Sequence, residues 1–155
     1  DMIFNNANVI SNIKAVENMF TFLGEHYDGN GYIYLVAHNG IRFDFVFFKE
    51  LVNNYLLHKN SELKDIEIFD IYPKIRYIDS LDVARKMVPH LYSYSQKNLC
   101  KIFNIVQNNA HRAIGDVEDL EKIYITIVNY GINKFKLDDD FIGNTDRVYD
   151  YIYNI

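Results

Sequence analysis

Three residues with ionisable side chains lie where the chain is predicted to pass from a loop into a helix. Asp44 ends the segment HNGIRFD, soon after the apolar run YIYLVA, and His111 and Asp116 are the two ends of HRAIGD. Taken singly, each carboxylate is explained as a helix cap, because the helix dipole favours negative charge in a first turn. His111, taken singly, is explained as a packed or surface residue. As a set, the three side chains would meet at one edge of a sheet, and we predict a functional site there.

The elements that position these residues alternate between strands and helices, which predicts an α/β fold. The runs YIYLVA (32–37) and IRYIDSL (75–81) are rich in β-forming residues and predict two parallel, buried strands joined by a helix. Apolar spacing predicts helices over 12–26, from Arg42 to Leu56, 82–88, 96–105 and 113–130, the last buried through Val117, Leu120, Tyr124 and Ile127 and ended by Gly131. Two strands make a thin sheet for so many helices.

Two other stretches give weaker signals. Residues 58–74 are polar and irregular apart from IEIFDIY, and a hairpin arm, an extra edge strand and an insertion all fit them. The tail contains LDDD and a tyrosine-rich end, and it predicts one more helix packed on the outside. We therefore divide the chain into a main portion, residues 1–133, and a helical tail, residues 134–155.

Composition excludes several classes of protein. A net charge of −5 is unlike that of a general nucleic-acid coat protein, although bound metal ions would supply local positive charge. The single cysteine excludes an internal disulfide and suits a reducing compartment. No apolar run is long enough for a membrane span and no signal peptide is present, so we expect an intracellular protein, cytoplasmic or nuclear and not secreted.

Four segments resemble a known family in order and spacing: VAHNGIRFDFVFFKEL, YIDSL, SYSQKNL and HRAIGDVEDL. They are similar to the DEDDh 3′–5′ exonucleases, the DnaQ-like branch of the ribonuclease H-like fold, and most similar to the TREX-type members. The resemblance covers about residues 1 to 131. It implies a ribonuclease H-like fold and hydrolysis of nucleic acid from a 3′ end.

The resemblance also implies a site with two Mg²⁺ or Mn²⁺ ions, which prefer oxygen ligands. Asp44 and Asp116 match the family's metal carboxylates, and His111 matches its general base, a role that suits a near-neutral pKa. Glu118 and Asp119 follow Asp116 but point elsewhere at helical spacing, which indicates surface positions.

Four further residues would contact the substrate. His38 and Asn39 would shape the pocket for the terminal nucleotide. Arg42 would meet a phosphate, and a solvated arginine explains it equally well. Tyr94 would stack near the substrate, and core packing is the favoured alternative.

One family motif has no counterpart in this chain. The family carries a D-x-E pair on the first strand of an antiparallel meander, whereas the chain begins with Asp-Met-Ile. We therefore expect a fragment that lacks the N-terminal antiparallel strands and is inactive alone. Its partners would be single-stranded or 3′-end nucleic acid and the missing segment or a chain that supplies it. A homodimer and an RNA substrate stay open, as does the alternative of an inactive, exonuclease-derived binding or scaffold module.

Overall fold

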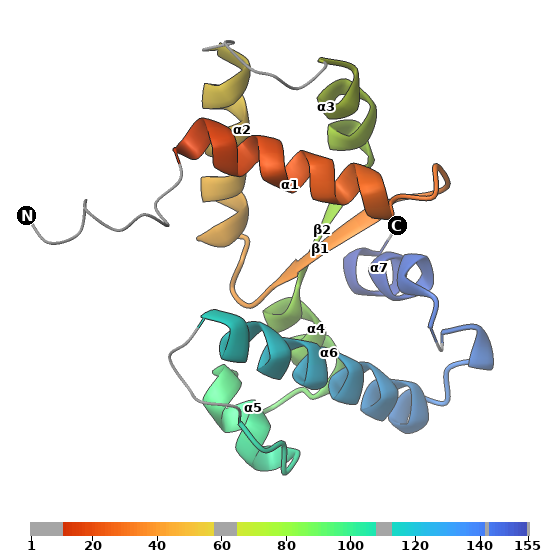
Figure 1. Ribbon diagram of the computed structural model, residues 1–155. Helices are drawn as coiled ribbons and strands as arrows, with labels where there is room; N and C mark the ends of the chain where they lie inside the picture. The colour runs from red at the N-terminus through yellow and green to blue at the C-terminus, as the bar shows by residue number, and fades with distance from the viewer. Residues whose placement is uncertain (1–10, 58–64, 108–112, 142, 155) are drawn as a thin grey trace, which may run out of the picture. The chain divides into compact units, whose positions relative to one another are not determined.

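The computed structural model describes residues 11–57, 65–107, 113–141 and 143–154 (Figure 1). Its helices and strands are, in chain order, α1 (Asn12–His26), β1 (Ile33–Ala37), α2 (Asp44–Leu57), α3 (Asp65–Ile71), the 3₁₀ helix η1 (Tyr72–Lys74), β2 (Ile75–Asp79), α4 (Ser80–Met87), α5 (Gln96–Ile102), α6 (Ala113–Phe135), the 3₁₀ helix η2 (Asp139–Phe141) and α7 (Thr145–Tyr153). The protein is mixed α/β and mostly helical.

The two strands lie side by side as a small parallel sheet (Figure 1). The parallel pairing expected for YIYLVA and IRYIDSL is thus confirmed. Helices α2 and α3 connect the strands, because a parallel pair needs a crossover connection rather than a tight turn. The further strands of a ribonuclease H-like sheet stay a prediction.

The chain divides into two compact units. The first comprises Asp1–Ile33 and Phe45–Arg76, and the second comprises Tyr34–Asp44 and Tyr77–Ile155. All the residues proposed above for the site that the structure describes belong to the second unit.

Helix α3 in the first unit corrects one expectation. A hairpin arm and an extra edge strand do not describe the last part of residues 58–74, because Asp65–Ile71 is helical and residues 72–74 form η1. The insertion stays a prediction. Ile68 and Ile71 are buried at a spacing of three residues, whereas Phe69 between them is exposed. The alternation of apolar and polar residues in IEIF is typical of a strand, but the buried residues are spaced three apart, as in a helix. Residues 58–64 lie outside the described part of the chain.

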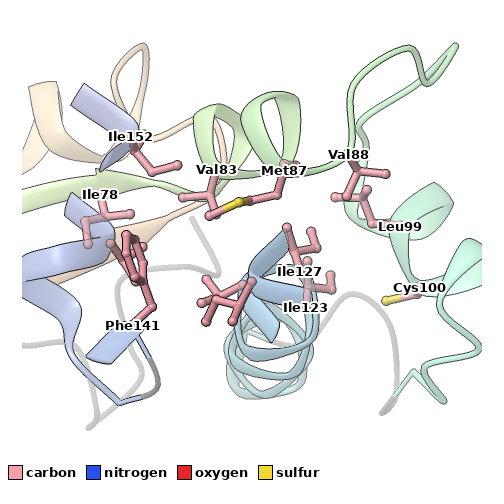
Figure 2. Close-up of a cluster of buried hydrophobic side chains, with 14 residues drawn as sticks. Ile78, Val83, Met87, Val88, Leu99, Cys100, Ile123, Ile127, Phe141 and Ile152 are labelled. Atoms are coloured by element: carbon pink, nitrogen blue, oxygen red, sulfur yellow. The ribbon is translucent and has the colours of Figure 1, made fainter. Parts of the chain in front are cut away.

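The core of the second unit is formed where α4, α5, α6 and α7 pack together (Figure 2). Met87 of α4 is fully buried in this cluster, and Ile123 and Ile127 of α6 are buried with it. The sequence predicted that Gly131 ends α6, but the helix continues to Phe135. A Cβ atom at Gly131 would lie 2.1 Å from Met87 Sδ, so this glycine permits close helix packing.

The buried stripe of α6 also differs from the predicted one. Val117 is 65% exposed, whereas Gly115, Asp119 and Ile123 are buried. Apolar residues occur around much of this helix, so their period fits more than one stripe, and packing selects the one that faces the core. Asp119 is therefore not a surface residue: it is 1% exposed, and the Lys122 ammonium lies 3.9 Å from its Oδ1 atom.

The helix expected in the tail is present as α7. Asn144 caps its N-terminus by accepting a hydrogen bond from the backbone N–H of Arg147. Val148 and Ile152 are buried in the core cluster of the second unit. In the described ranges, no helix is both long and apolar enough to cross a membrane.

Candidate functional site

The loop after β1 is a compact turn that leads into α2. Its first bend is made by Asn39, whose φ of 61° lies in the left-handed region that asparagine tolerates better than most residues. Two backbone hydrogen bonds then tighten the chain, from Arg42 N–H to the Asn39 carbonyl (3.3 Å) and from Phe43 N–H to the Gly40 carbonyl (3.2 Å). The loop thus delivers Asp44 to the first turn of α2.

A buried carboxylate from the neighbouring strand holds this loop. Asp79 ends β2 and is 2% exposed. Its Oδ1 atom accepts hydrogen bonds from the N–H groups of Asn39 (2.7 Å) and Leu81 (3.0 Å), and its Oδ2 atom accepts one from Ile41 (3.1 Å). Sequence reasoning missed this residue as part of the site. The available signal was an aspartate at a strand end followed by a helix, which is a capping pattern.

His38 links the same loop to the start of α4. Its Nδ1 atom lies 2.8 Å from Ser80 Oγ, and the imidazole also hydrogen-bonds with the backbone of Tyr94. Burial lowers the pKa of His38 below 6.5, against the opposing effects of the Tyr94 hydrogen bond and the Asp79 charge. A neutral imidazole can still make hydrogen bonds, because it has one donor and one acceptor nitrogen. The hydrogen bonds of His38 with Ser80 and Tyr94 therefore help to hold the loop after β1.

Asp44 and Asp116 are both exposed in the first turn of a helix, α2 and α6 respectively. Val36 of β1 and Val117 of α6 line the same hollow, of about 170 Å³, so the first half of α6 faces β1. The start of α2 follows that same strand through the loop at residues 38–43. Asp44 thus follows β1 along the chain, and Asp116 belongs to the part of α6 that faces β1.

The donor chemistry of this pair fits a hard divalent cation, which prefers carboxylate oxygen. Within the described residues, however, no group of three or more His, Cys, Asp or Glu side chains could hold a metal ion. His111, the expected general base, lies outside the described residues. The described side chains alone thus offer two candidate ligands and not a full set for a pair of ions.

The remaining predicted contacts are placed differently. Arg42 is exposed, as either a phosphate ligand or a solvated residue would be. Tyr94 is partly buried against the core cluster, its hydroxyl donates to the Val88 carbonyl (3.0 Å), and it accepts from Leu91 N–H (3.2 Å). These contacts agree with core packing, and stacking on a substrate stays a prediction.

Comparison with known proteins adds a family assignment. The model of the RNase T family, described as Exonuclease, matches residues 23–124, which is more than half of the chain. The matched segment contains the loop after β1, both helix starts and Asp79, and it ends before α7. Neither a curated protein nor a solved structure matches the chain.

Proposed function

The chain belongs to the RNase T family of exonucleases, and from this premise we propose that it is part of a metal-dependent 3′–5′ exonuclease acting on DNA. The family makes nucleic acid the class of substrate. The observation that carries the proposal is that Asp44 follows β1 through the loop at residues 38–43, while Asp116 lies on the part of α6 that shares a hollow with β1, and both aspartates are exposed. RNA stays an alternative substrate.

Asp44 and Asp116 have the role of metal ligands in this proposal. Mg²⁺ or Mn²⁺ bound there would neutralise charge at the scissile phosphate and make a bound water more acidic. Two carboxylates supply two negative charges, which offset one dication and not two. The proposal therefore requires further carboxylates, which the family's first motif, a D-x-E pair on a strand, would supply.

His111 has the role of general base. A histidine near the two aspartates would take the proton of the attacking water, because its pKa lies close to the working pH. Its support is the sequence HRAIGD, in which it precedes Asp116 by five residues. Asn39 and Arg42 are proposed to contact the terminal nucleotide and its phosphate from the loop after β1.

A second candidate function is a binding or scaffold module derived from an exonuclease. The observation that favours it is the lack of a third metal-ligating side chain among the described residues. Such a module would bind single-stranded nucleic acid without shortening it. The two candidates therefore differ in one measurable property, the release of nucleotides.

The decisive experiment uses the full-length polypeptide that contains this chain. With Mg²⁺ and a single strand of DNA labelled at its 5′ end, we expect a ladder of products that shorten from the 3′ end. Asp44→Asn and Asp116→Asn should each abolish the ladder, because each removes a metal ligand. His111→Ala should retain metal binding and slow turnover by about a hundred-fold.

The matched control is Glu50→Gln, which removes one exposed carboxylate from the same helix as Asp44. It should leave the ladder unchanged. Binding of the strand without any shortening would reject the exonuclease and favour the binding module. A ladder that survives both aspartate substitutions would reject the proposed ligands.

A further inference from the structure

The Asp79 carboxylate has more partners than a helix cap requires. An N-cap aspartate satisfies one or two N–H groups at the start of its own helix, and Asp79 does this for α4 through Leu81. Its other two hydrogen bonds go to Asn39 and Ile41, about forty positions earlier in the chain. A buried carboxylate is costly to desolvate unless its oxygens are hydrogen-bonded, and these three N–H groups supply that compensation.

We propose that Asp79 is a positioning residue, which fixes the loop after β1 and through it the start of α2 at Asp44. The role of Asp79 in catalysis rests on the proposed function, whereas its role in holding the loop does not. Only two residues lie between Ile41 and Asp44, and the turn hydrogen bond from Phe43 N–H to the Gly40 carbonyl stiffens that interval. Holding Asn39 and Ile41 by one carboxylate therefore limits where Asp44 can point.

The loop needs such a restraint because its backbone conformation is unfavourable by itself. Asn39 occupies the left-handed region, which costs free energy for any residue except glycine. The hydrogen bond from its own N–H to Asp79 Oδ1 is the shortest of the three, at 2.7 Å. The carboxylate thus acts at the residue whose conformation is least favourable.

Asp79 is itself held from its other side by the C-terminal helix. Its backbone N–H donates to the hydroxyl of Tyr153 in α7 (3.0 Å). The same tyrosine hydrogen-bonds with the side chain of Asp82, in the first turn of α4. Tyr153 lies outside the segment matched by the exonuclease family, so part of the support for the loop comes from an element that the family match does not include.

Two substitutions separate loop positioning from helix capping. Asp79→Ser keeps a good N-cap for α4 but is too short to reach the loop, so it releases both Asn39 and Ile41. Asp79→Asn keeps an acceptor oxygen in place of Oδ1 and puts an NH₂ group, which cannot accept, where Oδ2 receives Ile41. The serine variant should therefore affect two loop amides, and the asparagine variant chiefly one.

Amide hydrogen exchange and backbone NMR of residues 1–155 test the positioning directly, without any activity. In Asp79→Ser we expect exchange at Asn39 and Ile41 to accelerate by about ten-fold or more, because each amide loses a charge-assisted hydrogen bond. The Asp44 resonances should shift, while the amides of Ala84 and Met87 in α4 stay protected and show that the chain is folded. In Asp79→Asn only Ile41 should accelerate strongly. Unchanged exchange at both loop amides in both variants would overturn the proposal.

The catalytic meaning is tested on the full-length polypeptide. If the wild-type protein releases nucleotides, Asp79→Ser should lower kcat by about ten-fold or more with little change in KM, because a small displacement of a ligand affects the reacting geometry. An unchanged kcat alongside accelerated loop exchange would overturn a role for Asp79 in the site. An inactive wild-type protein would contradict the proposed function, whereas the exchange result would still decide whether Asp79 positions the loop.

Discussion

Burial separates four aspartates of the second unit into two pairs. Asp44 and Asp116 are exposed, and Asp79 and Asp119 are 2% and 1% exposed. A buried carboxylate can bind an ion only by giving up the hydrogen bonds that offset its desolvation, whereas an exposed one gives up water. Exposure therefore distinguishes Asp44 and Asp116, the proposed metal ligands, from Asp79, the carboxylate that holds the loop.

The lowered pKa of His38 predicts a specific dependence of stability on pH. In the unfolded chain His38 takes up a proton near pH 6.5, and in the folded protein it does so only at a lower pH. Between these two pKa values the unfolded state binds more protons, so the free energy of unfolding should fall as the pH is lowered through 6.5. The contribution is fully present above pH 6.5 and stops changing below the folded pKa.

Urea denaturation of residues 1–155 at pH about 7.5 and about 5.5 checks this expectation. His38→Gln should reduce the loss of stability between the two conditions. An equal loss in wild type and His38→Gln would contradict the argument.

The places of Asp44 and Asp116 in the fold could be predicted from the sequence because the signal for them is local. Asp44 and Asp116 each follow a loop and precede an apolar helical period, and both are in a first turn as expected. Asp79 could not be assigned its partners this way, because Asn39 and Ile41 are about forty residues distant in sequence. Its partners depend on where the loop after β1 lies against the end of β2, which the predicted pairing of the two strands does not specify.

The packing of α4 against α6 depends on Gly131, the glycine that was expected to end a helix. In Gly131→Ala the new methyl group would lie 2.1 Å from Met87 Sδ and 3.0 Å from Met87 Cβ, an atom that cannot move without its backbone. Overpacking of this kind destabilises a protein by about 1–3 kcal/mol. The better helix propensity of alanine than of glycine offsets about 1 kcal/mol of this. We expect a net loss of up to about 2 kcal/mol in the free energy of unfolding.

A second helical glycine serves as the control in the same denaturation experiment. A Cβ atom at Gly24 of α1 would lie 3.2 Å from Cδ1 of Ile71, a terminal methyl group that can move aside. Gly24→Ala should therefore be neutral or stabilising, because the gain in helix propensity is opposed only weakly. Equal effects at the two glycines would show that close helix approach is not what Gly131 provides.

Elements with one clear apolar face were predicted well, and those with several were not. Helix α1 has the predicted bounds, 12–26, with Val16 and Phe20 buried on one side. The face of α6 was predicted only in part, with Ile127 buried but Val117 exposed, and the helix α3 was not predicted. The apolar residues of each segment fit a second pattern. Tertiary packing selected between patterns that were locally equivalent.

The second unit extends beyond the segment that the exonuclease family describes. The matched residues end at 124, within α6, whereas the core cluster includes Val128 and Ile132 of the same helix and Val148 and Ile152 of α7. Removing α7 would expose part of this cluster and remove the Tyr153 hydroxyl from Asp79. The tail is therefore part of the structure that supports the candidate site.

Residues 1–155 by themselves are expected not to release nucleotides. Asp44 and Asp116 offset one dication, and catalysis of this kind depends on stabilising charge at both the attacking and the leaving oxygen. In the described residues no third ligand joins them. Addition of a segment that carries D-x-E should restore metal-dependent shortening of a 5′-labelled strand, whereas the same segment with both carboxylates changed to amides should not. Shortening by residues 1–155 alone, lost in Asp116→Asn, would mean that another carboxylate of this chain completes the site.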